Sequence, residues 1–378
     1  MEEKIMIIGV LKEIKPNEYR VAAIPSTVQE LTSRGHEVLV EHNAGKGSGY
    51  SDEEYIAAGA TVLQTAEEVY TKAELFYKVK EMFPEEYKYM NKDKIVYTYI
   101  HSNAHPEETD AILESKVTAI AYEDITDKDG NFPLLKPMSI LAGKGGFLAA
   151  LHHMQSVNDG NGTLLANVCG VEAPIISIIG AGNSGIGAAE LAAGFGNTVR
   201  ILDVNIKAME AARAKLPQNV SFMVSNRENL VKCLKESDVI INCIMWPKHR
   251  KDHLIYKEDL AMMKPGAMIV DVACDDEGAV ETCRSTTHDA PVYYEGGVKH
   301  YCVDNIPSAF ARTASILLST ATLPLLLEIA NKGVKKALKD NIHLRKGLTA
   351  FDGKLTLEET ALKQNRPLTD VDELVKQW

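Results

Sequence analysis

The sequence predicts an α/β protein of two domains, and three observations support this prediction. Short apolar runs of strand length alternate with helical segments through the N-terminal third of the chain. In the middle of the chain, a glycine-rich turn lies between an isoleucine-rich run and an alanine-rich segment. A chain of 378 residues is also too long for one compact core.

The first apolar run, residues 5–11, predicts a buried strand, and residues 21–35 predict a helix. Ser26 is the expected N-cap of this helix, and Gly35 lies just past its end, where a left-handed cap is favoured. A helix is expected over 52–60, and further strands over 37–41, 73–81, 94–102 and 117–124. We therefore expect an α/β domain with a parallel sheet in this third.

A turn-rich passage at 126–139 contains two prolines and marks a domain junction. A helix around 140–155 and a polar glycine loop at 158–162 should follow it, with later strands at 237–244, 267–273 and 300–305. From Arg312 a long apolar helix is expected to return to the first domain, followed by a helical, charged tail. The predicted domains are residues 1–133 completed by 312–378, and a nucleotide-binding domain at 134–311.

The glycine-rich turn follows the dinucleotide-binding pattern G-x-G-x-x-G. The apolar run 175–179 is followed by Gly180, Gly182 and Gly185, and then by the alanine-rich helix. These glycines permit a tight turn, close approach of a pyrophosphate, and close packing of helix on strand. The next strand ends at Asp203, whose carboxylate can accept hydrogen bonds from the ribose hydroxyls. The pattern predicts NAD as cofactor, because Asp203 would repel the extra phosphate of NADP.

The composition excludes some classes of partner. The net charge of -11 and the pI near 5.5 argue against a nucleic-acid surface, which normally needs clustered Lys and Arg. Small metabolites are the expected partners. The N-terminal stretch lacks the basic flank and long apolar core of a secretory signal, so we expect a cytoplasmic location.

Two further patterns bear on membranes and metals. The apolar stretch 316–330 is shorter than the ~20 residues needed to span a bilayer and is expected to be a buried helix, without membrane association. The six cysteines are scattered with no C-x-x-C pair. We therefore expect reduced thiols and no metal site.

Four polar residues lie at or just past the ends of predicted strands, at the edge where parallel α/β sheets bind ligands. Arg20 and Lys80 can hold a carboxylate or a carbonyl, His101 can exchange a proton with a carbonyl oxygen, and Asp275 can hold an ammonium or orient a water. Together they suggest a keto-acid or amino-acid site. Each residue also has a purely structural reading: a surface cation, a strand-end histidine, or a turn aspartate.

The chain resembles the alanine dehydrogenase family, which is related to portions of nicotinamide nucleotide transhydrogenase. The resemblance spans nearly the whole length, through motifs such as GVLKEIKPNEYRVAAIP, KVKE, YTYIH, IGAGNSG, MKPGAMIVDVA and HYCVDNIP. It implies two Rossmann-like, doubly wound domains flanking a cleft, usually assembled as a hexamer. The implied reaction converts L-alanine, water and NAD to pyruvate, ammonium and NADH.

The resemblance also assigns roles to individual positions. It implies His101 and Asp275 as catalytic residues, and Arg20, Lys80, Met138 and Asn305 as substrate-binding residues. Cofactor contacts are implied at Ser139, Gly180, Gly182, Gly185, Asp203, Ser225, Ile244, Met245, Leu254, Val303 and Asn305.

The chain departs from the usual family motifs in four segments, 139–144, 246–250, 274–278 and 310–314. Ile140 stands where the family usually has an acidic residue, and the loop from Trp246 to Arg250 is rebuilt. Two alternatives therefore stay open. One is an opine-type enzyme that reductively condenses pyruvate with an amino-acid amine, as carboxyethylornithine synthase does. The other is an NAD-binding regulator that has lost turnover.

Overall fold

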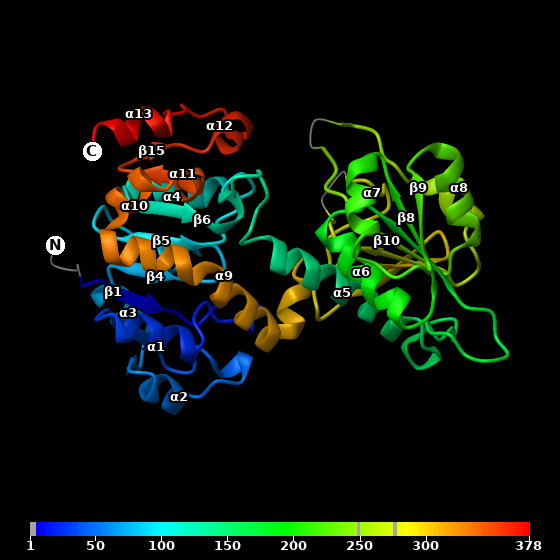
Figure 1. Ribbon diagram of the computed structural model, residues 1–378, viewed down its shortest axis with the longest axis horizontal. Helices are drawn as coiled ribbons and strands as arrows, with labels where there is room; N and C mark the ends of the chain where they lie inside the picture. Colours follow the sequence, from blue (N-terminus) through cyan, green and yellow to red (C-terminus); the bar gives the residue numbers. More distant parts are fainter. Residues whose placement is uncertain (1–4, 248–249, 275–277) are drawn as a thin grey trace. The chain divides into compact units, whose positions relative to one another are not determined.

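The computed structural model describes residues 5–247, 250–274 and 278–378, which form two compact units, each with its own sheet (Figure 1). The first unit comprises Met1–Pro137 and Ala311–Trp378, and the second comprises Met138–Phe310. The first unit is thus assembled from two separate stretches of chain.

The sheet of the first unit has the order β15-β14-β6-β5-β4-β1-β2-β3 in the described chain. Its strands are β1 (Ile7–Val10), β2 (Glu37–Glu41), β3 (Thr61–Leu63), β4 (Leu75–Tyr77), β5 (Ile95–Thr98), β6 (Thr118–Ala121), β14 (Leu348–Phe351) and β15 (Lys354–Leu355). From β3 to β6 all neighbours pair in parallel, which confirms the predicted parallel sheet. The chain order reverses between β1 and β4, so polar side chains after these strands gather at one edge.

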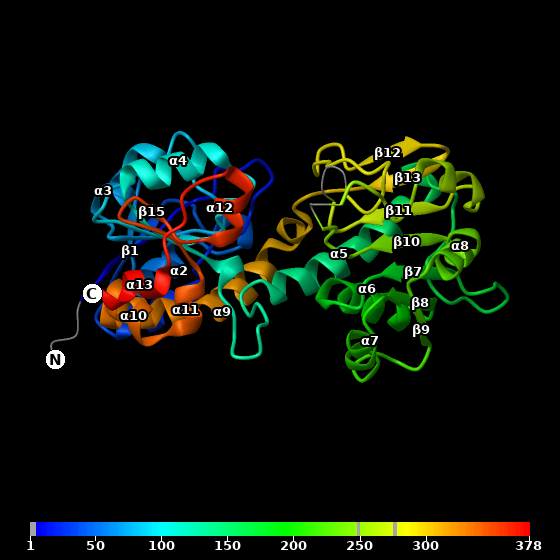
Figure 2. The ribbon, with the colours of Figure 1, turned by 90° about the horizontal axis from the view of Figure 1, so that it is seen from above.

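Helices cover both faces of this sheet. They are α1 (Pro25–Ser33), α2 (Asp52–Ala57), α3 (Ala66–Lys72), α4 (Pro106–Ser115), α9 (Ala311–Lys332), α10 (Val334–Asp340), α11 (Ile342–Lys346), α12 (Glu358–Gln364) and α13 (Val371–Lys376), with the 3-10 turns η1 (Lys46–Ser48), η2 (Tyr87–Tyr89) and η3 (Tyr122–Asp124). Figure 2 shows α3 and α4 on one side of the sheet and α9 and α10 on the other. Val69 of α3 and Phe76 of β4 are fully buried and belong to the core of that side.

The second unit has the sheet order β12-β13-β11-β10-β7-β8-β9. Its strands are β7 (Ile175–Ile179), β8 (Thr198–Asp203), β9 (Val220–Val224), β10 (Val239–Asn242), β11 (Met268–Asp271), β12 (Val292–Glu295) and β13 (Val298–Tyr301). From β9 to β13 the pairs are parallel, and β12 is an antiparallel edge strand that the sequence reading missed. This is the doubly wound Rossmann arrangement that the glycine pattern predicts.

The helices of the second unit are α5 (Lys136–His153), α6 (Asn183–Gly194), α7 (Ile206–Arg213) and α8 (Arg227–Glu236), with η4 (Ser156–Asn158), η5 (Lys257–Met262) and η6 (Ile306–Phe310). One core lies under α5, α6 and α7, where Phe147 and Ala188 are fully buried. The other lies under α8 and η5, around Leu230 and Leu260. The sheet is therefore covered on both faces, as its apolar parallel strands require.

Several sequence predictions about local structure were wrong. Helix α1 starts at Pro25 with Ile24 at the N-cap position, so Ser26 is inside the helix and caps nothing. Proline is favoured at the first helical position, because its φ suits a helix and the amide that it lacks would have no partner within the helix. The predicted strand over 73–81 ends at Tyr77, and α5 begins at Lys136, inside the predicted junction. Gly35 does have φ +85°, as expected for a residue just past the helix end.

The predicted helical tail also contains strands, β14 and β15. Strand β14 pairs antiparallel with β6, with Leu348 opposite Ile120. The hydrogen-bonding edge of β6 is open after the sixth strand of the parallel set, so a later segment can complete the sheet there. A strand of 4 residues is too short to show a clear alternation in sequence.

Among the described residues, one helical segment, Ile306–Lys332, is long and apolar enough by length and composition to cross a membrane. Within the first unit one face of its α9 portion is buried, including Leu318 and Ile329. Ser315 and Ser319 in the same helix accept hydrogen bonds from the amides of Val21 and Ile24, at 2.9 and 3.3 Å. These contacts make α9 a core helix of the first unit. The six cysteines are free thiols.

Candidate functional site

Three of the predicted site residues lie in loops at the carboxyl ends of neighbouring strands in the first sheet. Arg20 follows β1, Lys80 follows β4 and His101 follows β5. Their charges influence one another: the positive charge of Arg20 contributes to lowering the pKa of Lys80, and that of Lys80 contributes to lowering the pKa of His101. The fold therefore brings these residues together at one edge, as the strand-end rule predicts.

The Arg20 guanidinium is buried and is held by a carboxylate that the sequence reading did not single out. Its Nε donates to Glu18 Oε1 at 2.7 Å and its Nη2 to Glu18 Oε2 at 2.5 Å. Burial would lower the pKa of Arg20, but the Glu18 carboxylate outweighs this and the pKa lies above its ordinary value. Glu18 thus fixes the guanidinium, and a substrate carboxylate would have to share it with Glu18.

Lys80 lies in the loop after β4, with its side chain almost fully buried. Its carbonyl oxygen accepts a hydrogen bond from Thr98 Oγ1 at 2.8 Å, and its Nζ lies 3.8 Å from Glu81 Oε2. Burial lowers the pKa of the ammonium, Glu81 opposes this, and the charges of Lys15 and Arg20 lower it further. A buried ammonium at a sheet edge, with its Nζ 3.8 Å from the Glu81 carboxylate, is suited to an anionic or carbonyl ligand.

His101 sits after β5 with a backbone φ of +52°, in the left-handed region that few non-glycine residues adopt. Glu123, in η3 after β6, accepts hydrogen bonds from the amides of Ile100 and His101, and its Oε1 is 3.5 Å from His101 Nδ1. The ring stacks on Tyr99 with 5.9 Å between centroids. Burial lowers the pKa of His101 and Glu123 opposes this shift. The imidazole is held in place and is suited to proton transfer.

In the second unit the glycine turn has the geometry that a dinucleotide needs. Gly180 has φ +107°, and a methyl group on Gly185 would lie 1.9 Å from the Gly180 carbonyl oxygen. A methyl group on Gly182 would meet nothing within 4 Å, so the backbone at the start of α6 faces open space. The first and third glycines shape the turn, and the second leaves room for a phosphate at the helix N-terminus.

Asp203 is the last residue of β8, and its side chain binds the glycine turn. Its Oδ2 accepts from the Ala181 amide at 2.7 Å and its Oδ1 from the Asn205 amide at 2.8 Å. A carboxylate has about four acceptor positions, so these bonds leave capacity for ribose hydroxyls. The residues present therefore fit NAD at the glycine turn.

The other predicted cofactor positions in this unit also follow strands. Ser225 follows β9, and its amide donates to the Asp203 carbonyl at 2.9 Å. Ile244 follows β10 and packs against Gly180, and Met245 beside it is 81% exposed. Leu254 lies further along the same connection, and its amide donates to the Ala279 carbonyl at 2.8 Å.

Val303 and Asn305 follow β13 and are buried. The Asn305 carbonyl accepts from His288 Nε2 at 2.9 Å. Met138 and Ser139 lie in the first turn of α5, with Met138 buried. Asp275, the second expected catalytic residue, lies outside the described residues.

Two acidic residues of the site, Glu18 and Glu123, were missed by the sequence reading. Glu123 could have been found, because it lies at the carboxyl end of the predicted strand at 117–124, on the ligand edge. Glu18 carries no such signal, since it lies in the turn before Arg20 and its role shows only in the folded contact.

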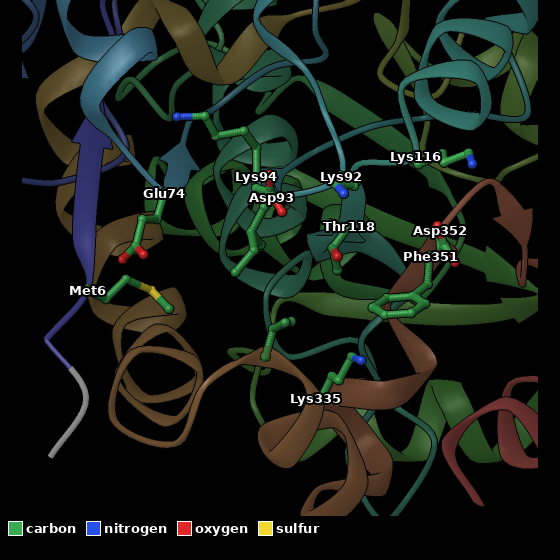
Figure 3. A pocket seen from close by; sticks show the side chains of 12 residues that line it. Met6, Glu74, Lys92, Asp93, Lys94, Lys116, Thr118, Lys335, Phe351 and Asp352 are labelled. Atoms are coloured by element: carbon green, nitrogen blue, oxygen red, sulfur yellow. The ribbon is translucent and has the colours of Figure 1, made fainter. Parts of the chain in front are cut away.

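Cavities lie at both edges of the first sheet. One of about 270 Å³ is lined by Arg20 and Glu18 with neighbouring residues at the carboxyl edge. Another of about 370 Å³ opens at the opposite, amino edge, near the starts of β1, β5 and β6 (Figure 3). Several lysines line this second cavity. One of them, Lys94, is already bonded to the protein, because its Nζ donates to the carbonyls of Tyr70 and Thr71 at the end of α3. The first cavity lies at the ligand edge and adjoins the candidate site at Arg20.

Comparison with known proteins gives matches over nearly the whole chain. A family model described as "Alanine dehydrogenase/PNT, N-terminal domain" matches residues 9–142, and one described as "Alanine dehydrogenase/PNT, C-terminal domain" matches residues 147–358. An alanine dehydrogenase of Methanococcus maripaludis is 42% identical over 98% of this chain and 100% of its own length. The alanine dehydrogenase of Bacillus subtilis is 43% identical over 94% of each chain. A solved L-alanine dehydrogenase superposes with a TM-score of 0.91 at 37% identity, covering 95% of this chain and 99% of the other.

Proposed function

Because the chain belongs to the alanine dehydrogenase/PNT family, we propose that it is an NAD-dependent alanine dehydrogenase. It would convert L-alanine, water and NAD to pyruvate, ammonium and NADH, and run the reverse amination. The observation that carries this proposal is the grouping of Arg20, Lys80 and His101 at one sheet edge, in a chain similar over its full length to alanine dehydrogenases.

In the amination direction each residue would have one task. Arg20, fixed by Glu18, and Lys80 hold the carboxylate and carbonyl of pyruvate. His101 protonates the carbinolamine oxygen as water leaves, and Asp275 positions ammonia. The chemistry supplied by bound NADH is hydride transfer to the substrate carbon.

Binding of the cofactor would rest on the second unit. The amides at the start of α6 would bind the pyrophosphate, and Asp203 would accept from the adenosine ribose. The first unit would be the substrate domain and the second the nucleotide-binding domain. Met138, Ser139, Ser225, Ile244, Met245, Leu254, Val303 and Asn305 would complete the two binding sites. We further propose a cytoplasmic homohexamer with small-molecule partners, without nucleic acid, membrane or a resident metal.

The choice of amine is the sharpest test. We expect pyruvate, NADH and ammonium to give alanine, identified by mass, with little NADH oxidation when ornithine or another free amino acid replaces ammonium. The margin between amines should be modest, because rejection by size is worth only ~1–3 kcal/mol per methylene. A secondary amine containing both carbon skeletons as the main product would assign the opine-type reaction. NADH binding without turnover for any amine would assign a regulator.

A further inference from the structure

The loop after β4, which carries Lys80, is held by three carboxylates, of which Glu13 and Glu108 come from other parts of the first unit and Glu86 from the same loop. The Val79 amide donates to Glu13 Oε1 at 2.6 Å, the Met82 amide to Glu108 Oε1 at 2.7 Å, and the Phe83 amide to Glu86 Oε2 at 2.9 Å. Backbone amides of an irregular segment have no strand or helix partner, so each needs one from elsewhere. These bonds bracket Lys80 on both sides.

Two of the three carboxylates have a buried cation nearby. Lys78 is fully buried, and its Nζ donates to Glu86 Oε1 at 2.8 Å and lies 3.6 Å from Glu13 Oε2. Burial raises the pKa of Glu13 to about 7, although Lys78 opposes this shift. Glu13 and Glu86 can therefore be understood as parts of one buried ionic cluster.

Glu108 differs from the other two carboxylates. It is 1% exposed, no ion pair is found for it among the described residues, and its Oε2 has no hydrogen-bond partner within that part of the chain. Burial raises its pKa well above the ordinary value. A buried carboxyl group with one oxygen unbonded is costly, so its presence calls for a compensating role.

The place of Glu108 in the fold indicates that role. It lies in the first turn of α4, and this helix begins just after the loop that carries His101. Next to it, Thr109 Oγ1 donates to the carbonyls of Ser102 and His105, at 3.1 and 2.9 Å. Glu108 thus joins the Lys80 loop to the helix that is bonded to the His101 loop.

We propose that Glu108 is a positioning residue, which holds the Met82 amide and so fixes the Lys80 ammonium relative to His101. The proposal rests on the proposed function, in which Lys80 binds the keto acid. Glu108 itself is buried under the loop and acts through Lys80, so its effect should appear in the KM for pyruvate.

The main variant is Glu108→Leu, which removes the acceptor and keeps an apolar side chain of similar length. We expect the KM for pyruvate to rise about tenfold, because small displacements of a binding group weaken ligand binding strongly, while the KM for NADH stays unchanged. Glu108→Gln keeps an acceptor oxygen for Met82 and should stay close to the wild type. Glu107→Leu, on the exposed side of the same helix, is the matched control and should change neither constant.

A double-mutant cycle separates positioning from a general structural role. In a Lys80→Ala background, Glu108→Leu should raise the KM for pyruvate no further. In the single variant Glu108→Leu, hydrogen exchange in the peptide containing residues 78–83 should be faster than in the wild type. If Glu108→Leu does not fold, Glu108→Asp withdraws the carboxylate by one methylene and should show the same coupling.

Three results would overturn the proposal. An equal rise in KM with and without Lys80 would make Glu108 merely structural. Faster exchange in the loop with an unchanged KM would show that the position of Lys80 does not depend on Glu108. If Lys80→Ala by itself left the KM for pyruvate unchanged, Lys80 would have no role in binding the keto acid. That result would contradict the proposed function, whereas the other two results contradict only the role of Glu108.

Discussion

Glu123 bonds to the backbone of His101 and also lies beside its ring: its carboxylate accepts the His101 amide, and its Oε1 is 3.5 Å from His101 Nδ1. The first contact stabilises the left-handed backbone of His101, and the second favours the protonated imidazole. Glu123 therefore fixes the backbone of the residue that we assign to proton transfer, and its charge opposes the lowering of that residue's pKa by burial.

His101→Ala should lower kcat for reductive amination by ~10²-fold or more, because a positioned acid typically contributes 10²- to 10⁴-fold. The Kd for NADH, measured by fluorescence, should stay nearly unchanged. Normal turnover in this variant would move the proton-transfer role to another residue. Loss of NADH binding would mean that His101 is structural.

Glu123→Gln should shift the pH dependence of kcat. Glu123 raises the pKa of His101 against the lowering effect of burial, so removing its charge should lower that pKa further. In a pH series of the amination rate, the limb that reports His101 should therefore move to lower pH. A shift to higher pH, or none, would contradict the assigned pairing. Glu67→Gln, at an exposed position in α3, is the control.

Asp203→Asn should relax the preference for NADH over NADPH by at least about tenfold in kcat/KM, because the charge that would repel the 2′-phosphate is removed. The asparagine keeps an oxygen that can accept from the Ala181 amide. Asp238→Asn is a matched control, since Asp238 accepts from the Ile175 amide at 2.8 Å, at the start of β7. An unchanged cofactor ratio in Asp203→Asn would remove Asp203 from cofactor recognition.

Asp271→Asn should flatten the pH dependence of stability. Asp271 is buried at the end of β11, and burial raises its pKa to about 7, although Asn242 bonds to it at 2.8 Å. Asp271 thus holds its proton more tightly in the folded state than in the unfolded state. The contribution of this proton to the free energy of unfolding is complete below about pH 4, and it is lost as the pH rises through about 7. A shift of this size corresponds to a few kcal/mol at most, on the order of 4.

We expect the thermal midpoint of the wild type to fall between pH 5 and 8 more steeply than that of Asp271→Asn, by calorimetry of the intact chain. Asp304→Asn, at an exposed position in the same unit, should follow the wild-type curve. Parallel curves for all three proteins would show that Asp271 does not carry this dependence.

The sequence by itself determined the features that are encoded within a short stretch of chain. The parallel strands, the glycine turn at Gly180–Gly185 and the acid at Asp203 follow from apolar runs and from backbone conformations that only certain residues adopt. The placement of Arg20, Lys80 and His101 at or just past strand ends was predicted from the same apolar runs, and the carboxyl ends of parallel strands share one edge.

Only the tertiary structure decided the contacts between distant segments. Glu123 reaches His101 across 22 positions, Glu108 reaches Met82 across 26, and β14 pairs with β6 across more than 200. No local pattern marks these partners, because a carboxylate or a short extended segment can also remain exposed to solvent. Only the folded chain provides the unpaired amide or the open sheet edge that each of them binds. The strand-end positions of the candidate site residues can therefore be predicted from the nearby sequence. The orientation and charge state of these side chains depend on contacts that form only in the folded protein.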